Sequence, residues 1–470
     1  MADGQVRVLS TDLVQAAEQP RHTAEAERIP LTPCDLRFIL LGPNQKGLLF
    51  RKPTTGPTEG RTTFIIQSLK SSFSRALASF YPFAGRLSVD EHADAGRTAS
   101  VYIDCNNNAG ALFVHAAADG VSVADVLEPL YVPAVLWSFF PLNRMRNHHG
   151  FSGPLLAVQV TELVDGFFIG CTINHVVADG ATFWRFMNLW SGICRSGGGG
   201  GGGGGYSAEM MNGSDKSRVF SRQWLLDEKH RPVRFSWMVV ENLEQKVVPP
   251  QHLKERVFHF SREKLAALKA QANAEAGGGS QISSLQSLIS HIWRAVFRNR
   301  SNYNPDPDRD LKFLLFFGFR SRLQPRVLED YFGNAIVSQS VVLKEGELLV
   351  AEKGLGRVAA AINRVVAEQT DEKLKEAMES WIGNPKFLKM GELEEGMMLL
   401  GSSPRYDVYG NDFGWGKPVA VRSGAGNKFD GKVTVYPGVE AGSMDVEICL
   451  LPETAERLGR DLEFMAAVGV

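Results

Sequence analysis

The segment CTINHVVADGATFWRF, residues 171–186, joins the end of an apolar, β-branched run to the start of an aromatic-rich helical pattern. The run DGFFIGCTIN before the histidine predicts a central β-strand, and ATFWRFMNLWSGI after it predicts a helix with a broad apolar face. A strand followed closely by a helix is typical of α/β folds, in which polar residues at strand ends face crevices. The segment therefore places His175 where an α/β protein concentrates its chemistry.

His175 and Asp179 stand four residues apart at this junction. A neutral imidazole, with an unperturbed pKa of about 6.5, can accept a proton from a hydroxyl, an amine or a thiol. Asp179 could hydrogen-bond the imidazole as in a catalytic triad, or it could cap the helix or pair with a distant arginine. We expect Gly180 to supply the positive φ of a turn. The H-x-x-x-D spacing alone leaves these interpretations open.

The composition is that of an ordinary globular protein. The chain has 470 residues, 44% hydrophobic and 22% charged, with 51 Lys and Arg against 52 Asp and Glu. This balance provides no bulk field for nucleic acid. The sequence has no apolar run of membrane-spanning length, we expect no secretory leader, and five scattered cysteines argue against a disulfide framework. We expect a cytoplasmic, monomeric protein without a membrane span.

Strand and helix patterns alternate in both halves of the chain, which predicts the α/β class. Glycine occupies positions 197–205 without interruption, and such a tract suits a flexible connection. We therefore predict an N-terminal domain over 1–195, a glycine-rich crossover linker over 196–230 and a C-terminal domain over 231–470. ETAERLGRDLEFMAAV predicts a single closing helix, and DLKFLLFFGF predicts a buried strand.

The sequence offers few alternatives to His175 as a reactive group. His148 and His149 lie in a polar loop without a carboxylate at useful spacing, so we predict no metal site. GLGRVAA does not form a dinucleotide-binding glycine turn, and no P-loop is present in the sequence. Cys171 lies inside the apolar strand, where an inert thiol is the commoner outcome.

A second segment, YGNDFGWGKPVAV, contains the run Asp412-Phe413-Gly414-Trp415-Gly416. HVVADG and DFGWG in this order resemble the signature pair of the BAHD family of plant acyl-CoA-dependent acyltransferases. LTPCDLRF, FYPFAGRL, SHIWRA and FRSRLQPRVLEDYFGNA are also similar to the family, so the resemblance covers nearly the whole chain. INHVVADGATFW and SSPRYDVYGNDFGWGKP look like a branch with cuticle-related enzymes and acetyltransferases. The family pattern often has two adjacent histidines, whereas Asn174 takes the first place here.

The resemblance implies a two-domain fold with mixed sheets, flanking helices and a tunnel between the domains. It implies acyl-CoA as a co-substrate, no permanently bound cofactor, and transfer of the acyl group to a hydroxyl or amine of a small molecule. His175 would be the general base, and Trp415 or a neighbouring group would stabilise the oxyanion. Asp179 would pair with Arg320, or with Arg322 as a second choice.

The remaining site residues follow partly from this resemblance and partly from their own chemistry. Asp412, Gly414 and Gly416 would hold the DFGWG loop, and a structural role for Trp415 stays open beside the catalytic one. Arg405 would bind a carboxylate of the acceptor, unless it is a surface arginine. Ser283 and Ser284 would contact CoA at a helix N-terminus. A lyase or a non-catalytic ligand-binding protein on the same scaffold is the alternative function.

Overall fold

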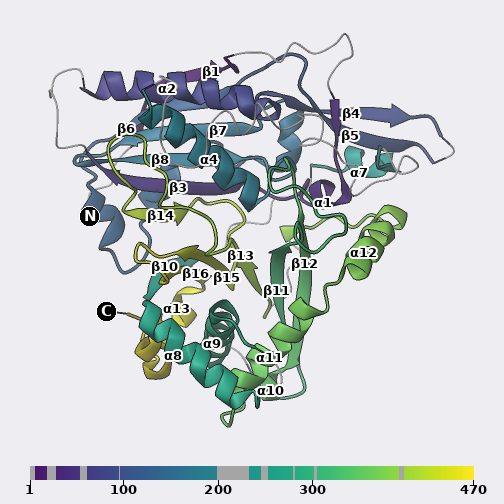
Figure 1. Cartoon of the computed structure of the whole chain (residues 1–470), viewed down its shortest axis with the longest axis vertical. Coiled ribbons are helices and arrows are strands. Elements are labelled where there is room, and N and C mark those ends of the chain that lie inside the picture. The colour runs from purple at the N-terminus through teal and green to yellow at the C-terminus, as the bar shows by residue number, and fades with distance from the viewer. Residues whose placement is uncertain are drawn as a thin grey trace.

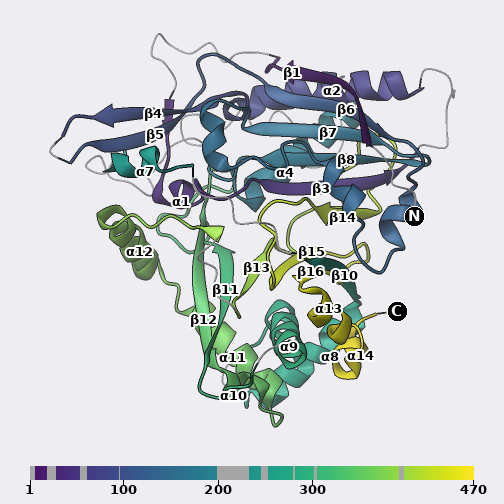
Figure 2. The ribbon, with the colours of Figure 1, turned by 180° about the vertical axis from the view of Figure 1, so that it is seen from behind.

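The computed structural model describes residues 6–17, 28–52, 61–94, 96–197, 232–244, 252–278, 281–300, 304–390 and 396–469. Nearly all of the predicted linker at 196–230 lies outside these residues. The molecule consists of two stacked halves, each with its own mixed sheet and covering helices (Figures 1 and 2). The predicted α/β class is confirmed.

The first sheet belongs mainly to the N-terminal half. In spatial order its strands are β1 (Val6–Val14), β6 (Ala111–Ala118), β7 (Leu156–Glu162), β8 (Gly166–Ile173), β3 (Asn44–Arg51) and β14 (Ala420–Ser423). Strand β8 is buried along its whole length, as its apolar sequence predicts for a central strand. Because β8 ends at Ile173, His175 lies just beyond the C-terminal end of this central strand.

Two long helices cover one face of this sheet, α2 (Arg61–Ser79) and α4 (Gly180–Arg195). Trp190 of α4 is fully buried, and its Nε1–H donates to the carbonyl of Leu69 and to Ser72 Oγ, both at 3.1 Å. A buried indole with a satisfied N–H fixes the two helices against each other. The short helix α3 (Val123–Leu127) and the 3₁₀ turn η2 (Ala134–Phe139) pack on the opposite face.

The second sheet belongs to the C-terminal half. Its strands are β10 (Lys254–Phe260), β16 (Met444–Leu450), β15 (Lys432–Pro437), β13 (Met398–Gly401), β11 (Asp310–Gly318) and β12 (Ile336–Lys344). Helices α8 (Arg262–Glu275), α9 (Ser284–Asn299) and α11 (Gly354–Ala367) enclose its core together with α13 (Pro452–Leu458) and α14 (Leu462–Ala467). Every residue of α9 from Ser287 to Phe297 is buried, so this helix is enclosed on all sides rather than along one face.

Smaller elements complete the fold. A third sheet contains β2 (Arg28–Pro30), β5 (Thr98–Asp104), β4 (Arg86–His92) and β9 (Phe235–Ser236). The remaining helices and 3₁₀ turns are α1 (Pro33–Leu36), η1 (Tyr81–Ala84), η3 (Asn147–Phe151), α7 (Trp237–Glu241), α10 (Glu345–Leu349) and α12 (Asp371–Gly383).

Two strands whose residues fall within the predicted C-terminal domain, 231–470, lie on the N-terminal half. Strand β9 pairs with β5, and β14 pairs antiparallel with β3, with Ser423 opposite Lys46. In Figure 1 the yellow-green β14 lies beside β3 of the upper half. The division at 195 and 231 stays a prediction, but two segments after residue 231 pair with strands of the N-terminal half.

The structure corrects two sequence predictions. The closing segment forms two short helices, α13 and α14, because Asp461 caps the second one by accepting from Phe464 N–H at 3.0 Å. Strand β11 is not uniformly buried, since Leu314 and Phe316 are only partly covered and line a cavity. Its apolar sequence therefore reflects a cavity wall on one face and packed core on the other. Among the described residues, no helix combines the length and apolar character required to cross a bilayer.

Candidate active site

A cavity of about 1090 Å³ lies between the two halves of the molecule. Its walls come from β3 and the start of α4 on one side, and from β11, β13, β15 and the N-terminus of α9 on the other. Six predicted site residues line it: His175, Gly180, Ser283, Ser284, Arg320 and Arg405. The other five predicted residues do not line it: Asp179, Asp412, Gly414, Trp415 and Gly416.

The imidazole of His175 is partly buried in the cavity wall. Its ring stacks on Phe38, with centroids 4.3 Å apart and planes 6° from parallel. Burial lowers the pKa of His175 from its ordinary value, and the positive charges of Lys432 and Lys46 act in the same direction. Its own backbone carbonyl and the charge of Asp179 oppose this shift but do not cancel it. The ring is therefore held in its neutral form at neutral pH.

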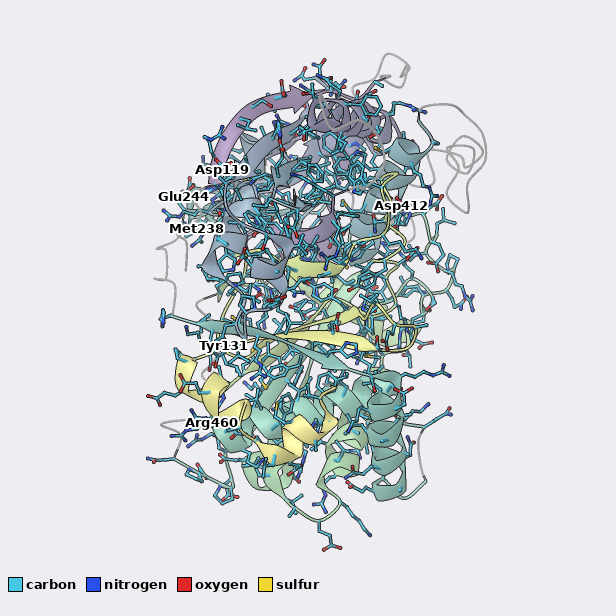
Figure 3. The ribbon with its side chains drawn as sticks, turned by 90° about the vertical axis from the view of Figure 1, so that its left-hand side faces the viewer. Asp119, Tyr131, Met238, Glu244, Asp412 and Arg460 are labelled. Carbon is cyan, nitrogen blue, oxygen red and sulfur yellow. The ribbon has the colours of Figure 1, made fainter. Side chains whose placement is uncertain are left out.

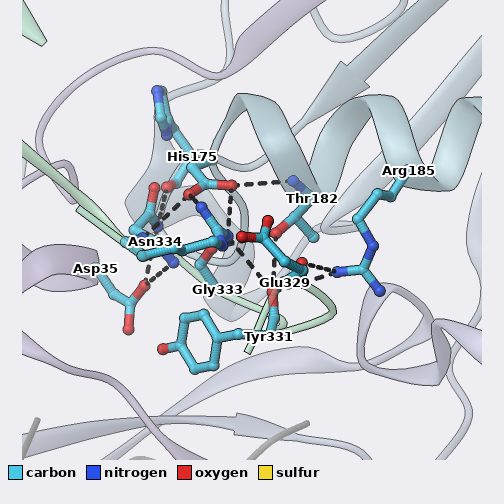
Figure 4. Close-up of polar contacts among 11 residues, drawn as sticks. Asp35, His175, Thr182, Arg185, Glu329, Tyr331, Gly333 and Asn334 are labelled. Atoms are coloured by element: carbon cyan, nitrogen blue, oxygen red, sulfur yellow. Dashed lines mark hydrogen bonds and ion pairs between the residues drawn. The ribbon is translucent and has the colours of Figure 1, made fainter. Parts of the chain in front are cut away.

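The backbone of His175 is fixed from both sides by buried amides. Its N–H donates to Asn147 Oδ1 at 2.8 Å, and its carbonyl accepts from Asn334 Nδ2 at 2.9 Å. Asp35, fully buried, accepts from both the backbone N–H and Nδ2 of Asn334 at 2.9 Å. Figure 4 shows the contacts of Asn334 with Asp35 and with the His175 backbone, and the imidazole of His175 turned away from them. Because three separate segments hold the peptide, the ring position is preorganised.

Asn174, at the position where the family pattern often has histidine, is a structural residue. Its Nδ2 donates to the carbonyl of Asn147 at 2.6 Å, and its Oδ1 accepts from Val176 N–H at 3.1 Å. The side chain is buried, so both halves of the amide are satisfied inside the protein. Asn174 thus ties the loop that carries His175 to the same Asn147 that holds the neighbouring peptide.

Asp179 forms a buried bidentate ion pair with Arg320. Arg320 Nη1 donates to Oδ2 at 2.6 Å, and Nη2 donates to Oδ1 at 3.1 Å. The carboxylate also accepts from Thr182 N–H at 2.9 Å, as the N-cap of α4, and from Ala335 N–H at 3.1 Å. Burial alone would raise the pKa of Asp179, but Arg320 and these N–H groups lower it below its usual value.

The geometry decides between the interpretations of Asp179. Its carboxylate caps the helix and pairs with an arginine, and among the described residues it makes no hydrogen bond to the imidazole. Arg322, the second-choice partner, instead donates to the carbonyls of Val366 at 2.9 Å and Gln369 at 3.2 Å. The site is therefore not a triad.

Gly180 is required for space rather than for backbone conformation. We expected a positive φ, but Gly180 is the first residue of α4 and is absent from the positive-φ glycines. A Cβ atom at this position would lie 2.7 Å from the Tyr406 hydroxyl oxygen and 2.8 Å from its Cε2. Tyr406 comes from the segment before the DFGWG loop and lines the cavity. The close packing of this ring on the helix start excludes any side chain.

The DFGWG loop lies at the other end of α4. Asp412 Oδ1 accepts from the N–H groups of Gly414 at 2.8 Å and Gly416 at 3.0 Å, and its Oδ2 lies 3.9 Å from Arg195 Nη1. Gly414 and Gly416 adopt φ values of 106° and 109°, which only glycine tolerates readily. The carboxylate and the two glycines thus close a tight turn against the last residues of the helix.

Trp415 is packed among aromatic rings. Its centroid lies 6.1 Å from that of Phe50, 6.0 Å from that of Phe167 and 5.7 Å from that of Phe413. It does not line the cavity that contains His175. This arrangement fits the structural interpretation of the loop, and it gives no contact for a role at the reacting carbonyl.

The predicted CoA and acceptor contacts lie at the cavity wall. Ser283 caps α9 by accepting from Gln286 N–H at 3.3 Å, and Ser284 begins the helix. The free N–H groups of a helix N-terminus favour anions. Arg405 is exposed, with no side-chain hydrogen bond or ion pair among the described residues. It therefore sits at the solvent-facing part of the cavity.

In the folded chain the carboxylate of Glu244 lies beside His148 and His149, which have no carboxylate at useful spacing in the sequence. His148 Nε2 and His149 Nε2 lie 3.2 Å and 3.4 Å from Glu244 Oε1. His149 Nδ1 accepts the N–H of Arg146 at 3.1 Å, so the ring proton is on Nε2 and that nitrogen is a donor rather than a metal ligand. In Figure 3 Glu244 and Asp412 lie on opposite sides of the molecule.

Several residues of the site escaped the sequence analysis. Phe38 and Asp35 occur in LTPCDLRF and Asn334 occurs in YFGNA, stretches noted only for their resemblance. Tyr406 likewise occurs in SSPRYDVYGNDFGWGKP, a stretch noted only for its resemblance, whereas Asn147 carried no signal. Their roles depend on contacts across 28 to 299 positions of the chain, which spacing rules do not reach.

We predict that Asp179→Asn lowers the free energy of unfolding by about 3–5 kcal/mol, because it leaves Arg320 buried without its counter-charge. Urea denaturation followed by circular dichroism measures the change. Asp119→Asn is the control, since the Arg7–Asp119 pair has side chains 60% and 72% exposed and should contribute less than about 1 kcal/mol. Equal losses in the two variants would contradict the assignment.

Two glycines of α4 provide a matched comparison. Gly180→Ala should destabilise the protein by about 1–3 kcal/mol, because its methyl group collides with Tyr406. Gly192→Ala should be neutral or stabilising by up to about 1 kcal/mol, since no atom lies within 4 Å of the added methyl. Thermal and urea unfolding of both variants check this, and a neutral Gly180→Ala would show that the Tyr406 contact is not tight.

Comparisons with known proteins agree with this geometry. A model of the Transferase family matches residues 5–465. An acetyltransferase of Arabidopsis thaliana described as uncharacterized is 37% identical, over 94% of this chain and 95% of its own. The BAHD acyltransferase DCR of the same plant is 33% identical, over 93% of this chain and 88% of its own.

Solved structures show the same fold. Vinorine synthase aligns with a TM-score of 0.68 and 20% identity, covering 99% of this chain and 98% of that one. The TRI101 protein of F. graminearum, solved with coenzyme A and deoxynivalenol, aligns with a TM-score of 0.73 and 16% identity, covering 94% and 99%. With two sheets enclosing one cavity, the sequence signatures in place and the family model spanning nearly all residues, the chain belongs to the Transferase family of BAHD acyltransferases.

Proposed function

We propose that the protein transfers an acyl group from a CoA thioester to a hydroxyl or amine of a small plant metabolite, with His175 as the general base. The observation that carries this proposal is the neutral, rigidly held imidazole in the wall of a cavity of about 1090 Å³ between the two halves. A cavity of this size can hold a drug-sized acceptor together with part of a CoA thioester. The TRI101 proteins were solved with coenzyme A bound, which supports a CoA substrate for this fold.

The reaction needs one group that first accepts a proton and then returns it. Nδ1 of His175 is buried and has no hydrogen-bond partner among the described residues, so we assign the proton transfer to Nε2. Nε2 removes the proton from the acceptor oxygen or nitrogen as this atom attacks the thioester carbonyl. The resulting tetrahedral intermediate expels the CoA thiolate, and the imidazolium returns its proton to the sulfur. No acyl-enzyme forms, so no activated serine or cysteine is needed.

The other residues position the reactants. We assign Ser283 and Ser284, with the N–H groups that begin α9, to the phosphates of CoA. Arg405, at the exposed side of the cavity, would attract a negatively charged part of a substrate. Asp412, Gly414, Trp415 and Gly416 brace the end of α4, and we assign them no chemical step. A monomer located in the cytosol stays a prediction.

A screen of acyl-CoA thioesters against alcohols and amines tests the function through the release of free CoA thiol. Acyl transfer requires both substrates and yields the acylated acceptor by mass spectrometry. A product that forms without any CoA thioester would instead establish a lyase on this scaffold. Binding of substrates without release of thiol in any combination would leave only a ligand-binding protein.

We predict that His175→Ala lowers kcat by more than about 100-fold, because the acceptor loses its proton acceptor. The fold should persist, since the ring lines a cavity and its backbone contacts with Asn147 and Asn334 do not need the imidazole. Steady-state kinetics and circular dichroism measure the two effects. His149→Ala, outside the cavity wall, serves as the control. Near-normal turnover by His175→Ala would exclude the base assignment.

The pH dependence follows from the lowered pKa of His175. Protonation removes the base, so kcat/KM falls as the pH drops through a pKa below the ordinary value of about 6.5. With a neutral acceptor, the midpoint of the acid limb should therefore lie below about pH 6.5. Initial rates at low substrate concentration locate the midpoint. An acid limb centred above pH 6.5 would contradict a buried neutral base.

A further inference from the structure

Two lysines that the acyl-transfer mechanism does not use line the same cavity as His175. Lys46 comes from β3 in the N-terminal half, and Lys432 comes from β15 in the C-terminal half. Lys46 Nζ lies 5.3 Å from the centre of the Tyr436 ring, and Lys432 Nζ donates to the carbonyl of Asn427 at 3.0 Å. Within the described part of the chain neither ammonium group has a carboxylate partner within 4.0 Å.

The neighbouring carboxylates are already occupied by a third lysine. Lys428 Nζ lies 2.7 Å from both Glu255 Oε2 and Glu447 Oε1. Glu447 also accepts from Ser423, the residue opposite Lys46 in the β3–β14 ladder. Burial and the adjacent Glu447 raise the pKa of Glu255, whereas Lys428 opposes this shift. The cluster therefore has more positive than negative charge.

The remaining titratable groups around the cluster do not supply the missing negative charge. Burial raises the pKa of Cys449 to about 12 and that of Tyr436 well above its ordinary value, so both stay neutral. Arg422, also near Tyr436, is a further cation. Burial and the adjacent lysines lower the pKa of Lys46 to about 7 and that of Lys432 to about 8. Within the described residues, these two amines thus have no carboxylate partner of their own to stabilise their charged forms.

We propose that Lys46 and Lys432 form a carboxylate-binding subsite, so that the protein acts on a substrate that carries an acid group. The acid belongs either to the acceptor, as in a hydroxy acid, or to the acyl group, as in the CoA thioester of a dicarboxylic acid. Lys46 and Lys432 lie on opposite walls, and a carboxylate between them would accept a charge-assisted hydrogen bond from each. The assignment of the acid to a transfer substrate rests on the proposed acyl-transfer function.

Binding of benzoate and of its neutral counterpart benzamide tests the subsite without any turnover. Isothermal titration of the whole protein should show benzoate binding that Lys46→Gln and Lys432→Gln each weaken by about tenfold or more. Lys373→Gln is the control, because it removes an exposed lysine of α12 and should leave benzoate affinity unchanged. Benzamide should bind more weakly than benzoate and respond to none of the substitutions.

Proton uptake adds a second readout that a merely structural role would not move. A carboxylate stabilises the charged form of a lysine whose pKa is about 7, so benzoate binding at about pH 7.5 should take up protons. Titrations in buffers of different ionisation enthalpy measure this uptake, and Lys46→Gln should abolish most of it. Equal affinities for benzoate and benzamide, or benzoate affinity that only Arg405→Gln reduces, would overturn the subsite.

Turnover then identifies which substrate carries the acid. Malonyl-CoA is compared with acetyl-CoA, and para-hydroxybenzoate is compared with its methyl ester. The lysine variants should raise KM only for the acidic member of one pair, while turnover of the neutral members shows that the variants are folded. Lysine-dependent benzoate binding without thiol release from any pair would reject acyl transfer and keep the subsite. Turnover of both pairs that is insensitive to the lysines would reject the subsite and keep acyl transfer.

Discussion

The buried ion pair between Asp179 and Arg320 joins the two halves of the molecule. The carboxylate caps α4, which follows His175, and it receives hydrogen bonds from Arg320 beyond β11 and from the backbone of Ala335 before β12. The Asp179 side chain thus holds the start of α4, which packs on the first sheet, against the end of β11 and the start of β12 in the second sheet. Separating the buried Asp179 and Arg320 charges would cost free energy. The pair therefore holds the two halves in one arrangement and gives the cavity defined walls.

A second buried network places the histidine within that frame. Asp35 holds Asn334, and Asn334 and Asn147 hold the two polar groups of the His175 peptide. Every contact crosses between segments that are distant in the chain, so the imidazole keeps its place only when the whole fold is formed. The stacked ring of Phe38 then restricts the remaining freedom of the side chain. Preorganisation of this kind lowers the cost of reaching the geometry for proton transfer.

Burial also sets the electrostatics of the cavity. The same withdrawal from water that keeps His175 neutral destabilises the charged forms of Lys46 and Lys432. A base benefits from this, because it must be unprotonated before it acts. The charged forms of the two lysines are stabilised only when a negatively charged group enters the cavity. We therefore assign these lysines to substrate binding rather than to a structural role. Lys428 shows the contrast, since its two glutamates keep its pKa high despite equal burial.

The sequence alone determined the elements that local pattern controls. Apolar periodicity predicted β8 and α4 around His175, and the HVVADG and DFGWG segments, with Arg320 as the partner of Asp179, followed from the family resemblance. The tertiary structure decided the rest. It set the packing of Tyr406 on Gly180, the position of Trp415 outside the cavity, the pairing of β14 with β3, and the approach of Lys46 and Lys432. Periodicity reports the conformation and buried face of one segment, whereas these contacts depend on the shape and charge of segments hundreds of residues apart.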